Sequence, residues 1–535
     1  MLFRILALLL ALCVQQFVSA DLVVDLDYAK YRGTDLQNGV ARWAGMRYAR
    51  SVSRVDGMRF AAPQDPLPER MGLVVDASKF GPTCIGSTST IPNEFGGKES
   101  EDCLFVNVFA PTISASNTTT TVQNSTLLPV YVFIQGGGFN TNGNANYNGV
   151  KLLKASNNSM VIVNFNYRVG PYGFLASKEI ADEKALSLNN GLKDQRQLLK
   201  WVQKHISKFG GDPNHVVLGG ASAGAGSVVF QLTAYGGRDD KLFHGTAAES
   251  PAFPPLRNAT TSQFMYDDLR NATGCQDLKC MREINAVDFQ KAVRGLNKPF
   301  PGAKSAPLYF WNPTLDYDFI KDYTYNELRA GHFVKVPTIF GDDQNDGLSF
   351  TPSVLNSLLR TQQFLTDQFP NIDNNEDIKT IRRAWRGPVD ANNDPRWRSV
   401  AADIYGHIRY TCPSLNASAE FTRRGASSWQ YRWNFGSAMH VSELGPIWNN
   451  GTSPAGVFIQ QYWVSFIKTL DPNNLTTTYY TANGPLTSPV WETYGTGNGK
   501  RMRFGNDDDV KMETISEDQK AKCDAIIKLG TQLAQ

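Results

Sequence analysis

The chain is 535 residues long, and its 53 Lys and Arg residues nearly balance its 50 Asp and Glu residues, for a formal net charge of +3. These charges are mixed along the sequence, which argues against nucleic acid or an acidic macromolecule as a partner. Because no internal repeat and no Pro/Gly/Ser linker divides the chain, we expect one elaborated domain over residues 21–535.

The first residues have the layout of a cleaved signal peptide. One Arg precedes an apolar run from Ile5 to Val14, and the small residues that end at Ala20 predict cleavage there, so residues 1–20 are the predicted signal peptide. The apolar run is shorter than the roughly 18 to 20 residues that a bilayer span needs, and no later stretch is long and apolar enough. We therefore expect a protein without a membrane span, secreted or held in the lumen of the secretory pathway.

The cysteines favour disulfides. Removing Cys13 with the signal peptide leaves an even set, which is expected to pair in an oxidising compartment. Metal binding is the poorer interpretation, because no pair has Cys-x-x-Cys spacing and no histidines cluster beside them. Spacing alone leaves the pairing open for the remaining residues, Cys84, Cys103, Cys275, Cys280, Cys412 and Cys523.

Sequons of the form Asn-x-Ser/Thr lie in polar, turn-like stretches. In a secreted chain they are candidate N-glycosylation sites on surface loops. The segment 112–126 is similar to a linker, but strand patterns resume directly after it, so we interpret it as a glycosylated loop. The sequons are at Asn117, Asn124, Asn157, Asn258, Asn271, Asn416, Asn450 and Asn474.

The centre of the chain alternates short apolar runs with helical patterns, which is typical of an α/β fold with a mostly parallel sheet. Residues 129–134 and 160–167 are predicted to be buried strands. Between residues 194 and 209 the apolar positions follow the spacing of an amphipathic helix, which Gly210-Gly211 ends. Residues 216–218 are predicted to be a short strand that leads into a Gly-x-Ser-x-Gly motif.

That motif, residues 220–224, indicates a nucleophile. A strand, then Gly-x-Ser-x-Gly, then a helix that we predict to begin at Ala225 is a nucleophile elbow. Its tight turn forces Ser222 into a strained conformation, and the glycines two residues to either side avoid clashes with strand and helix. A serine hydroxyl is a poor nucleophile at neutral pH, so Ser222 needs a base and needs donors for the oxyanion that forms.

The predicted strand 129–134 ends in a glycine run, residues 136–138, whose bare backbone can turn N–H groups toward a substrate oxygen. A glycine loop follows an early strand in this way in α/β-hydrolases, and the N–H after the nucleophile completes the oxyanion hole. The candidate donors are Gly137, Gly138 and Ala223. The alternative is a flexible glycine-rich turn, which the order of the run relative to Ser222 disfavours.

Two long stretches make the resemblance specific. FGGDPNHVVLGGASAG (residues 209–224) is similar to the nucleophile signature of type-B carboxylesterases, and EDCLFVNVFAP (residues 101–111) is similar to their second signature. The family also includes cholinesterases and fungal lipases, and the sequence most resembles fungal secreted carboxylesterases. The resemblance implies an α/β-hydrolase fold, a large central mostly parallel sheet flanked by helices, and ester hydrolysis without cofactor or metal.

The family's acid is usually Glu just before a Gly, in a loop that follows a strand. Here the predicted strand 336–340 leads into GDDQNDG, and Asp346 precedes Gly347. The shorter side chain leaves Asp343 as an alternative. We favour Asp346 because of its position in the motif and because of the order serine, acid, histidine.

The general base must be chosen among six histidines. His440, in a loop where an acid, Glu443, follows three residues later, matches the family pattern, and His407 is the alternative with a structural interpretation. The histidines on the predicted helix, beside the elbow strand or before the acid loop are set aside: His205, His215, His244 and His332.

The resemblance implies two further features. Ser250 should lie near the triad and support its hydrogen bonds, although Glu249-Ser250-Pro251 stands where the family has Gln-Ser-Gly. The disulfide pairs should be Cys84 with Cys103, Cys275 with Cys280, and Cys412 with Cys523.

The predicted function is hydrolysis of small-molecule carboxylic esters through an acyl-enzyme. The loop from Cys84 to Cys103 has only Ile85, Ile91 and Phe95 as sizeable apolar groups, too few for a strong interfacial lid, which favours dissolved short- or medium-chain or small aromatic esters. It has no Trp, which argues against a cholinesterase. The alternatives are a lipase or sterol esterase and, in another class, an inactive adhesion or binding protein, which the complete serine, acid and histidine set disfavours.

Overall fold

The computed structural model describes residues 22–535 except 38, 95–96, 113–125, 144–145, 373–374, 389–392, 482–483, 498 and 507–508. The predicted signal peptide, the sequons Asn117 and Asn124, and Phe95 fall outside the described residues.

The strands belong to one large sheet and three small ones. The strands of the large sheet are β3 (Thr34–Asp35), β4 (Val40–Arg47), β8 (Phe105–Pro111), β9 (Leu128–Ile134), β10 (Val161–Phe165), β11 (Gly211–Ala221), β12 (Gly245–Glu249), β13 (Thr338–Asp343), β14 (Ser428–Trp433), β17 (Lys500–Phe504) and β18 (Val510–Thr514). The small sheets contain β1 (Val23–Asp25), β2 (Lys30–Arg32) and β5 (Val74–Asp76); β6 (Thr83–Cys84) and β7 (Glu99–Ser100); and β15 (Thr478–Thr481) and β16 (Gly484–Thr487).

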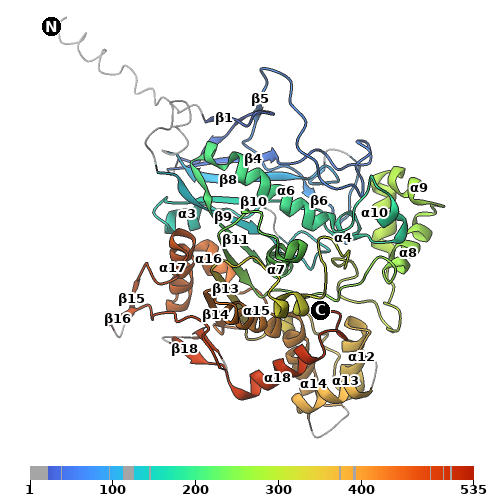
Figure 1. The fold of residues 1–535 in the computed structure, drawn as a ribbon, viewed down its shortest axis with the longest axis vertical. Coiled ribbons are helices and arrows are strands. Elements are labelled where there is room, and N and C mark those ends of the chain that lie inside the picture. Colours follow the sequence, from blue (N-terminus) through green and yellow to red (C-terminus); the bar gives the residue numbers. More distant parts are fainter. Residues whose placement is uncertain are drawn as a thin grey trace, which may run out of the picture.

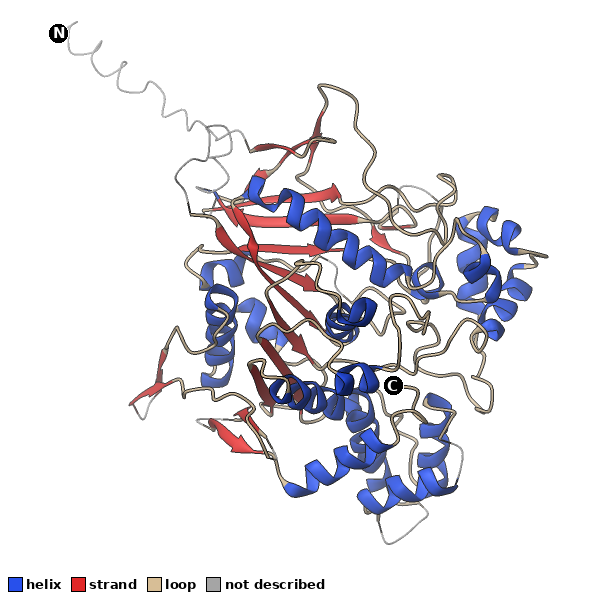
Figure 2. Cartoon of the chain, viewed as in Figure 1, coloured by secondary structure: helices blue, strands red, loops and turns tan. Residues whose placement is uncertain are grey.

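The large sheet is 11-stranded, in the order β18-β17-β14-β13-β12-β11-β9-β10-β8-β4-β3 (Figure 1). Neighbouring strands run parallel from β17 to β10, and the pairs at both edges are antiparallel. The predicted α/β architecture, a large mostly parallel sheet with helices on its faces, is confirmed (Figure 2).

The helices are α3 (Val150–Ala155), α4 (Gly170–Phe174), α5 (Lys178–Asp182), α6 (Asn190–His205), α7 (Ala223–Gly237), α8 (Gln263–Thr273), α9 (Leu278–Glu283), α10 (Ala286–Gly295), α11 (Thr324–Ala330), α12 (Leu358–Gln368), α13 (Asn375–Ala384), α14 (Arg396–Gly406), α15 (Cys412–Arg423), α16 (Leu444–Asn449), α17 (Pro454–Thr469) and α18 (Glu517–Lys528). Shorter turns are the 3-10 helices η2 (Ile206–Phe209) and η3 (Asp346–Ser349) and the π-helix η4 (His407–Thr411). In the described part of the chain, no helix is both long and apolar enough to cross a bilayer.

Apolar layers cover both faces of the sheet because alternate residues of a strand point to opposite faces. In β9, Val130 and Val132 pack in the core shared with α6 and α7, whereas Tyr131 and Phe133 pack with α16 and α17. A strand covered on both faces needs apolar residues at nearly every position. That requirement explains why β9 and β10 are nearly continuous apolar runs in the sequence.

The predicted elements are present, with shifts at their ends. The helix expected from residue 194 begins at Asn190, and its last expected turn is the separate 3-10 helix η2. The strand expected at residues 216–218 extends over Gly211–Ala221, because Gly211 already pairs with Leu128 of β9 before an irregularity in the register.

Disulfides join Cys84 with Cys103, Cys275 with Cys280, and Cys412 with Cys523. These are the pairs that the family resemblance implies. The last pair ties α18, near the C-terminus, to the start of α15, which packs on β13 and β14.

Replacing Cys412 and Cys523 together by Ala should lower the free energy of unfolding by about 4 to 5 kcal/mol, because loop-closure entropy grows with loop length. This bridge spans a separation of 111 residues. The Cys275–Cys280 bridge spans only 5, and its removal should cost about 2 kcal/mol. Urea unfolding followed by tryptophan fluorescence measures both losses, and equal losses would contradict the loop-length argument.

Candidate active site

Ser222 occupies a sharp turn between β11 and α7. Its backbone has φ 59° and ψ −122°, a strained conformation for a residue with a side chain. A Cβ on Gly220 would lie 2.6 Å from the backbone of Gly224, and one on Gly224 would lie 2.0 Å from the Ile134 carbonyl oxygen. Both motif glycines are therefore required by close packing. The helix begins at Ala223 rather than at Ala225, because Ser222 is itself the residue that precedes the first helical turn.

The carboxyl ends of four adjacent parallel strands bring the predicted site residues together. Ser222 follows β11, Ser250 follows β12, Asp346 lies just beyond β13, and His440 lies in the loop after β14. The Ser222 N–H donates to the Glu249 carbonyl at 2.8 Å, which joins the first two of these ends. In open α/β sheets this edge is where ligands bind.

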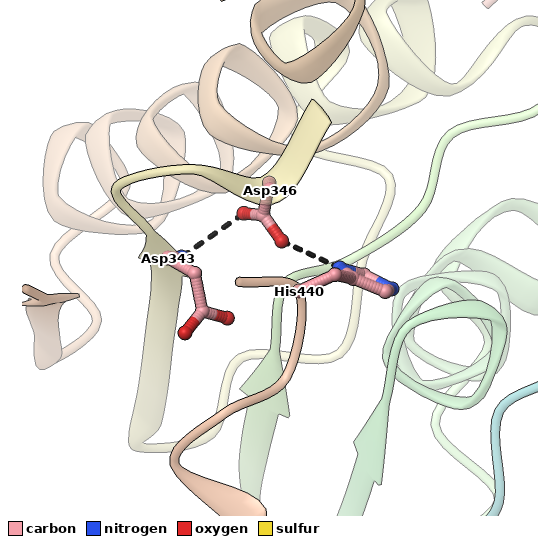
Figure 3. A group of neighbouring side chains, drawn as sticks. All are labelled: Asp343, Asp346 and His440. Carbon is pink, nitrogen blue, oxygen red and sulfur yellow. Dashed lines mark hydrogen bonds and ion pairs between the residues drawn. The ribbon is translucent and has the colours of Figure 1, made fainter. Parts of the chain in front are cut away.

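Asp346, rather than Asp343, contacts the predicted base. Its Oδ1 lies 2.5 Å from His440 Nδ1, and its Oδ2 accepts the Asp343 N–H at 3.0 Å (Figure 3). No hydrogen bond joins the Asp343 carboxyl to the imidazole (Figure 3); it accepts the Val441 N–H at 2.7 Å. The two carboxyls therefore have different contacts: Asp346 with the imidazole, and Asp343 with the backbone of the loop that carries it.

Ser250 lies between these two carboxyls. Its Oγ is 3.1 Å from Asp346 Oδ2 and 3.2 Å from Asp343 Oδ2, and its backbone φ of 51° is in the left-handed region. One hydroxyl hydrogen can be donated to only one carboxyl at a time. The position agrees with the supporting place that the resemblance implies, despite the altered residues on either side.

Burial raises the pKa of both aspartates. The pKa of Asp343 lies well above its ordinary value because of burial and because of the neighbouring carboxyls of Glu443 and Asp346. For Asp346 the hydrogen bond and charge of His440 oppose the effect of burial. The negative charge of the pair is therefore better placed on Asp346, and the proton on Asp343.

His440 is held by aromatic rings on one side and by Asp346 on the other. The rings of Phe350 and Tyr410 lie 4.9 and 4.4 Å from the imidazole, centroid to centroid. Its Nε2 points away from the acid loop (Figure 3) and has no hydrogen-bond partner among the described residues, Ser222 included. This nitrogen is the ring atom left to accept a proton, and such hydrogen bonds often tighten only when substrate is bound.

The glycine loop beside Ser222 is built around backbone that only glycine tolerates. Gly137 and Gly138 have φ of 120° and 61°, and a Cβ on Gly137 would lie 2.0 Å from the Thr141 carbonyl oxygen. The Asn140 side chain donates to the Gly138 carbonyl at 2.7 Å and fixes the loop. Ala223 is the first residue of α7, where N–H groups lack intrahelical partners. The candidate oxyanion donors are thus placed at a helix start and in a rigid loop.

Glu249 and Glu443 form a buried carboxyl cluster, and Glu443 is also a neighbour of the Asp343 carboxyl. Both carboxyl oxygens of Glu249 are buried with no hydrogen-bond partner among the described residues. Burial and the nearby Glu443 raise the pKa of Glu249 well above its ordinary value, while Glu443 accepts the Tyr431 hydroxyl at 2.5 Å. Burial therefore favours the neutral form of Glu249 over its carboxylate.

Three of the site's groups also form a cluster of the size that holds a metal ion. Asp343, Asp346 and His440 each offer a ligand atom within 4.8 Å of the others. The Asp346 oxygens are, however, already hydrogen-bonded to His440, Ser250 and the Asp343 backbone. These hydrogen bonds favour a role for Asp346 in orienting the His440 imidazole over a role as a metal ligand.

The alternative histidine, His407, contacts Asp403 and not the two aspartates of the acid loop. His407 Nδ1 is 2.8 Å from the Asp403 carbonyl oxygen, and its ring packs edge-on against Trp385. These contacts give His407 a structural place in the helices that follow the acid loop.

Sequence reasoning missed several aromatic residues around the site. A Cβ on Gly138 would lie 2.0 Å from the Tyr309 ring, so that ring lies directly on the glycine loop. Phe350 contacts both Tyr309 and the His440 imidazole. These residues come from separate loops with no shared motif, and no pattern in the sequence could have marked them.

The described sequons differ in exposure. Asn157, Asn271, Asn450 and Asn474 are exposed, and Asn258 is half-buried. Asn416 is half-buried in α15, and its Oδ1 is buried without a hydrogen-bond partner among the described residues. Exposure therefore favours the first four as glycan sites.

Comparison with known proteins gives consistent relatives. The model of the carboxylesterase family matches residues 20–524. The crystal structure of EstA from Aspergillus niger superposes with a TM-score of 0.85 at 35% sequence identity, covering 96% of this chain and 99% of that chain. Secreted lipase 4 of Gibberella zeae is 30% identical over 481 residues, 82% of this chain and 81% of its own length. Lipase 2 of Geotrichum candidum is 29% identical over 529 residues, 86% of this chain and 89% of its own length.

Proposed function

Because the chain belongs to the carboxylesterase family and is an esterase, we propose that it hydrolyses carboxylic esters through an acyl-enzyme on Ser222. His440 is the general base, and Asp346 orients it. The observation that carries this proposal is the 2.5 Å contact of Asp346 with His440 at the sheet edge where Ser222 forms the elbow.

The proposed reaction has two halves. Ser222 Oγ attacks the ester carbonyl while His440 Nε2 takes its proton, and the oxyanion is stabilised by the N–H groups of Gly137, Gly138 and Ala223. The imidazolium then gives the proton to the leaving alcohol. Water, deprotonated by the same nitrogen, attacks the acyl-enzyme, and the imidazolium returns that proton to Ser222 Oγ as the acid is released. Asp346 stabilises the imidazolium in both halves because it keeps its negative charge.

A fluorophosphonate probe tests the proposal directly, because it bonds only to an activated serine. The labelled peptide should contain Ser222, and labelling should abolish hydrolysis of p-nitrophenyl butyrate. A folded protein that neither takes the label nor releases nitrophenol would support the alternative of an inactive binding protein.

The loop between Cys84 and Cys103 supports an esterase for dissolved substrates rather than a lipase. Its apolar residues Ile85 and Ile91 are buried. The side-chain amide of Gln290 donates to the carbonyls of Gly86 and Ser89, each at 2.8 Å, and so ties the loop to α10. With only these two large apolar side chains among its described residues, the loop has little apolar surface to expose to oil if it opens.

We therefore expect no rate increase when tributyrin passes its solubility limit. The measurement is the initial rate across that limit, with dissolved p-nitrophenyl butyrate as a control for intact enzyme. Sharp activation by emulsified long-chain triglyceride would instead favour the lipase alternative, to which the names of two relatives also point.

We also propose that the protein is secreted. A relative named as a secreted lipase, the disulfides and the signal-peptide pattern of residues 1–20 support this location.

A further inference from the structure

Arg409 is a buried cation for which the described residues supply no anionic partner. It lies in η4 and is 3% exposed, and its Nε and Nη2 are buried with no hydrogen-bond partner among the described residues. The comparably buried Arg59, Arg168 and Arg432 each form an ion pair with a carboxylate. Arg409 is therefore an exception within the same protein.

The contacts of Arg409 place it at the active site. Its guanidinium carbon lies 5.5 Å from the centre of the Tyr309 ring, which rests on Gly138 of the glycine loop. The next residue, Tyr410, packs on the His440 imidazole. Behind it, the Arg409 carbonyl accepts the Phe253 N–H at 3.0 Å, and the adjacent N–H of residue 252 donates to the Ser222 carbonyl at 3.1 Å.

The groups around the guanidinium do not supply the missing charge. Burial raises the pKa of Tyr309, of Tyr405 and of Tyr410, so their hydroxyls stay neutral at physiological pH. The cation–π contact with Tyr309 offsets only part of the cost of burying an unpaired charge. Arg409 also stands in a π-helical turn between α14 and α15, a type of irregularity that is frequent at functional sites.

We propose that Arg409 binds a carboxylate of the substrate, so that the preferred substrates are esters that carry a second, ionised carboxyl group. The planar guanidinium fork matches a carboxylate in geometry, and one Arg balances one negative charge. An anionic ester is also water-soluble, in agreement with the packed loop at Cys84 to Cys103. The inference rests on the proposed ester hydrolysis and names its substrate class.

Two pairs of esters test it, because the carboxylate can belong to the acyl part or to the leaving group. In each pair the carboxylate is compared with its neutral amide: mono-p-nitrophenyl adipate with p-nitrophenyl adipamate, and 4-acetoxybenzoate with 4-acetoxybenzamide. The wild-type enzyme should prefer the carboxylate of at least one pair by about 10-fold or more in kcat/KM, the effect of one charge-assisted hydrogen bond.

Arg409→Met should reduce that preference to near unity, and Arg409→Lys should retain part of it, since a point charge remains. Arg294→Met, at an exposed position of α10, is the matched control and should leave both rates and their ratio unchanged. An unchanged ratio in Arg409→Met would overturn the proposal.

A measurement on the wild-type enzyme alone covers the case in which Arg409→Met does not fold. Adipate should inhibit hydrolysis of p-nitrophenyl butyrate at a concentration about 10-fold lower than adipamide does. Equal inhibition, together with no preference for either carboxylate ester, would overturn the carboxylate site while leaving ester hydrolysis intact. Failure to hydrolyse any of the esters would instead refute the proposed function itself.

Discussion

Replacing Ser222 by Ala should lower turnover of p-nitrophenyl butyrate by on the order of a million-fold, because the proposed acyl-enzyme forms on the Ser222 hydroxyl. The fold should persist. Ala has the same Cβ, so it neither relieves nor adds to the backbone strain at φ 59°, and the Ser222 side chain is not part of the hydrogen bonds that hold the acid loop. The thermal midpoint of unfolding checks this second expectation.

Ser250→Ala is the matched control for the Ser222 variant. Its hydroxyl touches both aspartates but not the reacting atoms, so its loss should reduce turnover far less. Near-normal activity in Ser222→Ala would mean that another residue is the nucleophile.

Asp346→Asn should lower kcat by on the order of ten-thousand-fold. The amide can donate to His440 Nδ1, which moves the ring hydrogen to Nε2 and leaves that nitrogen unable to take the serine proton. Loss of the negative charge also removes the stabilisation of the imidazolium. Steady-state kinetics at pH 7 to 8 measure the effect.

Asp343→Asn is the informative comparison, because burial and the neighbouring carboxyls of Glu443 and Asp346 raise the pKa of Asp343, which favours its protonated form. Asn is close in shape and charge to a protonated Asp, so turnover should fall by less than about tenfold. If Asp343→Asn proved the more damaging change, the assignment of the acid would be wrong.

Most of the fold could be predicted from local sequence patterns, namely apolar runs and glycine motifs. β9 and β10 are apolar at nearly every position because helices cover both faces of the sheet, and Gly220 and Gly224 are required by close backbone approach. Each of these constraints leaves a pattern in a short stretch of sequence, even where the contact itself is with a distant residue, as for Gly224 with Ile134. Element ends such as the start of α7 were misplaced by two residues because the turn at Ser222 passes directly into a helix.

The surroundings of the triad could not be predicted in the same way. The choice between Asp346 and Asp343 depended on a family position, and only the geometry separates their contacts. Tyr309, Phe350 and Arg409 meet at the site from different parts of the chain. Their meeting depends on how loops pack above the sheet, and a single sequence carries no local signal of such packing.

The order of the strands also governs when the chain can first react during its synthesis. Ser222 follows β11, but its base follows β14, a strand formed from residues much nearer the C-terminus. β12 pairs with β11, β13 with β12 and β14 with β13, so Ser222 has no proposed base beside it until all three strands are in place. A chain shortened before His440 should therefore be inactive even if its first half folds. Appearance of esterase activity would therefore time the completion of this half of the sheet in a refolding or translation experiment.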